Sequence, residues 1–180
     1  PQPTQVVCAD YVALSVGRSA HRPLVCLYAQ RRRRAVIFGK PTFRLASYNE
    51  HRADFERALA ATGCDEIVDI GPPLPSMPAE GAGIPVRAMG ILEAPAVRAV
   101  MRESLLGFVP YPLPFACKST IFAAYCAHGM LPMVHEQPTR EVDGIVMGAN
   151  VLPATPGMAP LTMERMAEVA LDLCVELDRH

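Results

Sequence analysis

The sequence predicts an α/β protein: a doubly wound, mainly parallel sheet of about six strands with helices on both faces. Three observations support this class. Short apolar runs alternate with longer helical patterns from residue 34 onward. The runs are unbroken rather than alternately polar, as expected of parallel strands that are buried on both sides. Glycine and proline separate most of the segments, which is typical of strand–loop–helix punctuation.

The composition restricts the class of protein further. With 180 residues, 51% of them apolar and 19% charged, the chain can build one domain with a substantial core. A net charge of −1 argues against a general nucleic-acid binder. We see no apolar run of the roughly 18–20 residues that a membrane helix needs, and no secretory signal. The six cysteines include no C-x-x-C pair, so reduced thiols and a cytoplasmic location are expected.

The segments of the predicted domain, residues 34–180, follow in a regular order. Capping-box spacing from Ser47 to Glu50 predicts the start of the first helix, and Gly63 predicts its end. Pro95 suits the first turn of the second helix, and Thr162 can cap the last. The expected strands are 35–38, 66–70, 84–89, 105–109, 131–134 and 145–147, with loops at 74–83 and 153–160. Residues 1–33 give no clear pattern beyond short apolar runs at 12–16 and 24–28, and are interpreted as a separate segment, such as the remnant of a preceding domain.

Ligands of doubly wound sheets bind at the carboxyl ends of strands, close to helix N-termini. Three loops are therefore candidates for the site: 39–44, 90–95 and 110–120. In the last loop, Lys118, Ser119 and Thr120 place one cation and two hydroxyls at the predicted start of an alanine-rich helix, where a phosphate can bind. The alternative is an ordinary serine cap beside an exposed lysine. The loop lacks the Gly-x-x-x-x-Gly-Lys pattern of a P-loop.

Further charged groups lie near the other predicted strand ends. Gly39 and Lys40 form either a simple turn or, with Arg44, the opposite side of a diphosphate site. His135 and Glu136 follow a strand and are candidate catalytic groups, although an exposed polar loop is the competing interpretation. No histidine pair has the spacing of a metal motif, so no metal is expected.

A basic run and a helical histidine have simpler interpretations. Residues 31–34 are four consecutive arginines at a strand entrance, and either form a solvated junction or contact an anionic partner such as a membrane surface. His128 is expected to satisfy helix carbonyl groups rather than to take part in catalysis.

Taken together, these motifs resemble the C-terminal donor-binding domain of GT-B-fold glycosyltransferases, in a divergent form of the retaining, glycogen-synthase-like class. The resemblance covers residues 34–178. It rests on the order of EIVDIGPPLP at 66–75, GIPVRAMGILEAPAVRAVMRESLLGFVPYP at 83–112 and KSTIFAAYCAHGMLPMV at 118–134. The last segment ends in Ala127-His128-Gly129 before a Pro-Met-Val strand, as family members do.

The resemblance implies a Rossmann-like domain that binds a nucleotide-diphosphate sugar without a metal or other cofactor. The sugar would pass to an acceptor such as a lipid-linked group or a polysaccharide, held mainly by another domain. The resemblance implies that Lys118, Ser119 and Thr120 lie at the diphosphate, that Gly39, Lys40 and Arg44 lie opposite, and that Arg87, Met89 and Gly90 border the nucleobase.

Two positions depart from the family pattern. Many members carry a pair of glutamates eight residues apart, and the matching positions here are Ala116 and Ala124. A non-catalytic phosphate-binding module, or a subunit completed by a partner, is therefore the main alternative to a glycosyltransferase. An unrelated doubly wound enzyme using His135 and Glu136 as acid and base is a third.

Overall fold

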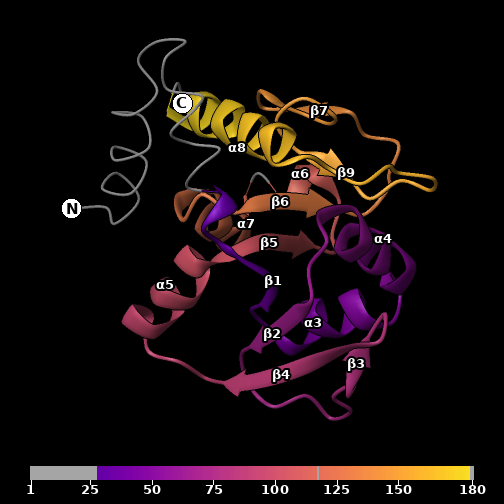
Figure 1. The fold of residues 1–180 in the computed structure, drawn as a ribbon, viewed down its shortest axis with the longest axis vertical. Coiled ribbons are helices and arrows are strands. Elements are labelled where there is room, and N and C mark those ends of the chain that lie inside the picture. Colours follow the sequence, from indigo (N-terminus) through magenta and orange to yellow (C-terminus); the bar gives the residue numbers. More distant parts are fainter. Residues whose placement is uncertain (1–27, 117, 179–180) are drawn as a thin grey trace.

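A computed structural model describes residues 28–116 and 118–178 of the chain, with the side chains of 174–178 left out (Figure 1). The predicted runs at 12–16 and, but for Tyr28, 24–28 lie outside this part. The described strands are β1 (Arg32–Phe38), β2 (Glu66–Ile70), β3 (Glu80–Gly81), β4 (Ile84–Gly90), β5 (Ser104–Val109), β6 (Leu131–Val134), β7 (Glu141–Val142), β8 (Ile145–Val146) and β9 (Leu152–Pro153). The labelled helices are α3 (Pro41–Tyr48), α4 (Arg52–Thr62), α5 (Ala94–Glu103), α6 (Leu113–Ala116), α7 (Thr120–Ala127) and α8 (Met163–Asp178).

The central sheet confirms the predicted class. Its seven strands run in the order β3-β4-β2-β1-β5-β6-β9, and every neighbouring pair is parallel except β3 with β4. Without the antiparallel edge strand β3, the order in chain sequence is 3-2-1-4-5-6, the arrangement of the Rossmann fold. The direction of winding therefore reverses between β1 and β5, and a doubly wound sheet opens a crevice at that point.

Alternation of side chains along β1 divides the core into two layers. Ala35 and Ile37 pack with residues of α4 and α8, whereas Val36 packs on the opposite face with residues of α5 and α7. Figure 1 shows α8 along the β6–β9 end of the sheet. Among the described helices, none is both long and apolar enough to cross a membrane.

The structure corrects two predicted elements. Ser47 does not cap a helix: it lies inside α3 and bonds the Phe43 carbonyl oxygen at 3.3 Å, and α4 begins only at Arg52. Pro41 starts α3 rather than ending a strand, because proline fits the first helical turn.

The sixth parallel strand was also misplaced. Ile145–Val146 pairs with β7 in a separate two-stranded hairpin, and β9 takes the predicted position at the edge of the central sheet. Pro153 is tolerated there because an edge strand has one row of unpaired backbone groups. The predicted loop at 74–83 likewise contains the two-residue strand β3.

Several local predictions are confirmed. Gly63 ends α4 in the left-handed conformation with φ of 64°. The Thr162 hydroxyl accepts a hydrogen bond from the Arg165 N–H at 3.2 Å, as expected of a helix cap. His128 places Nδ1 at 2.7 Å from the Ala124 carbonyl oxygen within its own helix. Cys64 is buried as a free thiol, and burial raises its pKa to about 11, so it is an unreactive core residue.

Candidate functional site

A cleft of about 930 Å³ lies at the carboxyl ends of the central strands. Its wall includes residues from the loops that follow β1, β2, β4 and β5, so it occupies the reversal point of the sheet. The lining residues are Phe38, Gly39, Lys40, Pro41, Phe43, Ile70, Gly71, Pro72, Ile91, Leu92, Tyr111, Pro112, Phe115, Lys118, Ser119, Thr120 and Ile121. Such a volume is near the upper end of ordinary ligand pockets and exceeds what a lone phosphate needs.

The cleft contains both of the lysines that the chain possesses. Lysine and arginine total 17, but only Lys40 and Lys118 are lysines. Both are exposed, both line the cleft, and neither has an acidic partner among the described residues. A lysine ammonium group is a compact, mobile charge that suits phosphate oxygens. Gly39 and Lys40 thus line the same cleft as residues 118–120, and their role at a diphosphate stays a prediction.

Ser119 has a different role from the predicted one. Its hydroxyl oxygen accepts hydrogen bonds from the backbone N–H groups of Ile121 at 3.1 Å and Phe122 at 3.3 Å, which makes it the N-cap of α7. The same hydroxyl also bonds the Tyr111 hydroxyl, and the pKa of Tyr111 is raised by burial. The competing interpretation, a serine cap beside an exposed lysine, thus fits Ser119. Among the described residues of this loop, Lys118 and Thr120 provide the other polar side chains that line the cleft next to it.

The cleft wall is otherwise mostly apolar, a feature that the sequence did not reveal. Phe43, Ile91 and Phe115 are the large apolar side chains with high exposure in the described part of the chain, and all three line this cleft. The ring of Phe43 lies 5.0 Å from that of Tyr111, centroid to centroid. Exposed aromatic surface in a cleft offers a face on which a flat, partly apolar group can stack.

Arg44 was predicted to contact the ligand, and this is wrong. Its side chain is 2% exposed on the inward side of α3, and it forms an ion pair with Asp69 of β2. Its Nη1 also donates to the Pro72 carbonyl oxygen at 2.5 Å, and the Tyr48 hydroxyl donates to Asp69 Oδ2 at 2.9 Å. Burial, followed by the charge of Asp69, raises the pKa of Tyr48. Arg44 therefore stabilises the cleft wall from the protein interior, through its hydrogen bond to the lining residue Pro72.

The three residues predicted to border a nucleobase lie outside the lining of the cleft. Arg87, Met89 and Gly90 do not line the cleft, whereas Ile91 and Leu92 do. Arg87 is exposed on β4, with Nε 3.2 Å from the Met89 sulfur. The Gly90 carbonyl oxygen accepts from the Gly71 N–H at 2.9 Å, so Gly90 fixes a neighbouring strand end instead of contacting the cleft.

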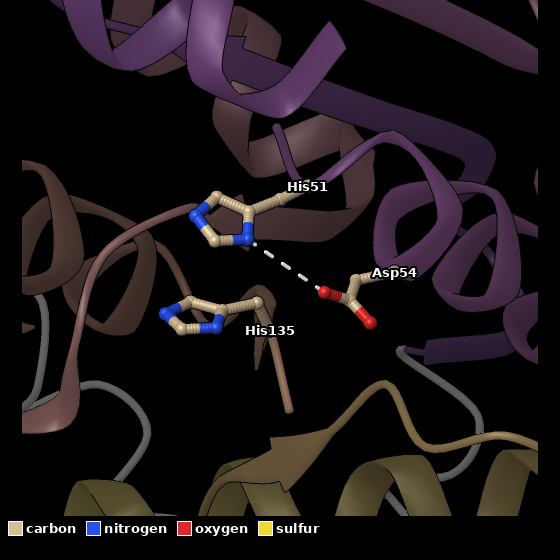
Figure 2. A group of neighbouring side chains, drawn as sticks. All are labelled: His51, Asp54 and His135. Atoms are coloured by element: carbon tan, nitrogen blue, oxygen red, sulfur yellow. Dashed lines mark ion pairs between the residues drawn. The ribbon is translucent and has the colours of Figure 1, made fainter. Parts of the chain in front are cut away.

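His135 and Glu136 lie at the end of β6, as predicted, but outside the cleft. His135 is buried and its ring stacks on that of His51, with the centroids 4.1 Å apart (Figure 2). Burial lowers the pKa of His135, and the neighbouring His51 lowers it further. Glu136 is held by Arg140 at 3.1 Å. Neither residue is placed to exchange protons with a ligand in the cleft.

The arginine run is partly used inside the fold. Arg31 donates to the carbonyl oxygens of Ser104 and His128, both at 2.7 Å, and Arg34 is buried against Glu66 at 2.9 Å. These two are unavailable to an anionic partner. Arg32 and Arg33 remain exposed, so a membrane contact through them stays a prediction.

The structure also explains one of the two positions that depart from the family pattern. Ala116 is fully buried at the end of α6, packed in the core layer that contains α5 and α7. A glutamate at that position would be buried in this chain rather than directed to a ligand. Ala124 is partly buried against the same layer.

No family model and no curated protein sequence matches this chain. Two similar solved structures are UDP-forming α,α-trehalose-phosphate synthases. The protein from Burkholderia xenovorans has 16% identity and a TM-score of 0.40 over 92% of this chain and 41% of its own. The protein from Burkholderia vietnamiensis has 17% identity and a TM-score of 0.39 over 97% of this chain and 43% of its own. The chain thus spans less than half the length of these structures, and its Rossmann-like assignment rests on its own strand order.

Proposed function

We propose that this domain binds the diphosphate of a nucleotide-diphosphate sugar in the cleft and serves as the donor-binding part of a glycosyltransferase. The observation that carries the proposal is that the only two lysines of the chain both line one cleft at the reversal point of the sheet. Two ammonium groups without acidic partners match two adjacent phosphates.

The aromatic and aliphatic rim gives the remainder of such a ligand a place to bind. A nucleobase is flat and stacks on aromatic faces, and Phe43 and Phe115 provide exposed rings beside the lysines. The ammonium groups would also stabilise the charge that develops on a departing diphosphate, which is the electrostatic contribution a metal-independent transfer needs. The acceptor would be bound by another domain or partner, and the glycogen-synthase-like assignment remains part of the proposal.

Titration calorimetry with UDP, GDP and ADP tests this proposal. We expect at least one of them to bind, and Lys40→Ala and Lys118→Ala each to weaken binding roughly ten- to hundredfold, as loss of a charge-assisted contact does. Arg98→Ala is the matched control, because Arg98 is an exposed cation on α5 outside the cleft. Absence of binding, or equal losses in all three variants, would overturn the proposal.

A second candidate function, a non-catalytic module or a subunit completed by a partner, is favoured by the cleft chemistry. Among the described residues that line the cleft, none is an aspartate, glutamate or histidine. These described residues thus offer cations for phosphates but no carboxylate or imidazole as a general base. Release of nucleoside diphosphate from nucleotide sugars separates the two functions: a module binds the nucleotide but releases none, alone or with candidate acceptors.

A further inference from the structure

A cluster separate from the cleft brings together His51, Asp54 and His135 (Figure 2). His51 precedes α4, Asp54 lies in the first turn of α4, and His135 follows β6. One potential ligand atom of each residue lies within 4.8 Å of those of the other two. We propose that these three side chains bind a divalent transition-metal ion, with Zn²⁺ as the probe.

His135 turns one ring nitrogen toward the other two residues. Figure 2 shows that this atom is Nδ1, whereas Nε2 lies on the side of the ring away from Asp54. Nδ1 also lies 2.9 Å from the backbone carbonyl oxygen of Glu136, so a metal ion bound at Nδ1 would replace that contact.

Asp54 is oriented by Arg57, which lies outside the cluster. One carboxylate oxygen binds the guanidinium of Arg57, whose Nε is itself held by the Ala154 carbonyl oxygen at 3.0 Å. The other oxygen, Oδ2, faces His51 Nδ1 at 3.7 Å, which is beyond hydrogen-bonding distance. The carboxylate is thus fixed by Arg57 with one oxygen left toward the histidines, as carboxylate ligands commonly are.

The two imidazole rings set a condition on binding. Their planes are 25° apart in a stack, so the two lone pairs do not converge on one point as they stand. The His51 side chain is 23% exposed and its Nδ1 already faces Asp54, so a rotation of this ring is what binding would require. Two nitrogens and one oxygen suit Zn²⁺ and similar ions better than Ca²⁺ or Mg²⁺, which prefer oxygen ligands.

Calorimetric titration of the tag-free, chelator-treated protein with Zn²⁺ is the test. We expect one ion per chain, with binding weakened more than about tenfold in His51→Ala, Asp54→Asn and His135→Ala. His128→Ala is the control, because His128 is, like His135, a buried histidine, but its Nδ1 bonds its own helix. If His135→Ala fails to fold, His51→Ala still decides the test, because the His51 side chain is partly exposed.

Cobalt substitution excludes the alternative that cysteines bind the ion. The Co²⁺ protein should lack the thiolate-to-metal charge-transfer band and lose its visible spectrum in His51→Ala. No Zn²⁺ binding, a thiolate band, or equal affinity in His51→Ala and His128→Ala would overturn the proposal. The outcome is independent of the nucleotide titration, because none of the three residues lines the cleft.

Discussion

Asp69→Asn should reduce the free energy of unfolding by about 3–5 kcal/mol, because it leaves the Arg44 guanidinium buried without its counter-charge. Asp69 is fully buried and Arg44 is 2% exposed, so water cannot replace the lost partner. The substitution also weakens the acceptor of the Tyr48 hydroxyl. Since small domains are stable by about 5–15 kcal/mol, the variant should lose a large part of its stability. Urea unfolding followed by circular dichroism measures the loss.

Glu103→Gln is the matched control for this prediction. Glu103 pairs with Arg32 at 3.6 Å, and both side chains are well exposed, 60% for the arginine and 59% for the glutamate. Glu103 also lies 3.8 Å from the buried Arg34, which keeps its closer partner Glu66 at 2.9 Å when Glu103 is changed. Exposed pairs contribute little, so no measurable change is expected. A loss below about 1 kcal/mol in Asp69→Asn, within the ordinary range of a neutral hydrogen bond, would contradict the assigned role of the Arg44–Asp69 pair.

Gly71→Ala should be the second most damaging change, at roughly 2–4 kcal/mol. Gly71 follows β2 with φ of 150°, and an added Cβ would lie 2.5 Å from the Gly39 carbonyl oxygen and 2.6 Å from Arg44 Nη1. The strand ends would have to separate, which changes the cleft as well as the fold. Affinity for the nucleotide should therefore fall together with stability. Thermal unfolding and calorimetric titration of the same sample test both effects.

Gly83→Ala separates backbone strain from the clash. Gly83 also has positive φ, 75°, but a Cβ there would meet nothing within 4 Å. Gly83→Ala should lower the free energy of unfolding only by the conformational penalty of about 1–2 kcal/mol, and should leave nucleotide affinity unchanged. If Gly71→Ala were no worse than Gly83→Ala, the close approach of the β1 and β2 ends would not be a structural requirement.

The sequence predicted best the strands that have both an apolar interior and a clear stop in glycine or proline. β2 was placed at its observed bounds because Gly71 and Pro72 end it sharply and the residues after Glu66 are apolar except for Asp69. α3 was missed because Pro41 was interpreted as a break, although proline is equally suited to a first helical turn. β9 was missed because a two-residue strand has no period of its own, and its pairing with β6 is a tertiary interaction.

The site was predictable in its location but only partly in its residues. Arg44 was assigned to the ligand by charge and position alone. The signal that could have corrected this was Asp69, a charged residue within an apolar strand, which requires a buried partner. The scarcity of lysine was a second available signal. All basic side chains of the Lys/Arg type are arginines except Lys40 and Lys118. The cluster of His51 and His135 has no sequence spacing to detect, since the fold alone assembles it.

Amine acetylation in the presence of a nucleoside diphosphate tests the central claim most directly, because Lys40 and Lys118 are the only lysine side chains that can react. The extent of modification of the two lysine-containing peptides is measured by mass spectrometry, with UDP, GDP or ADP added and with the corresponding uncharged nucleoside as control. If both lysines hold the same diphosphate, one of the nucleotides should slow both reactions together several-fold, and its nucleoside should not. Unchanged rates with all three nucleotides, or protection of one lysine alone, would contradict a shared diphosphate site in this cleft.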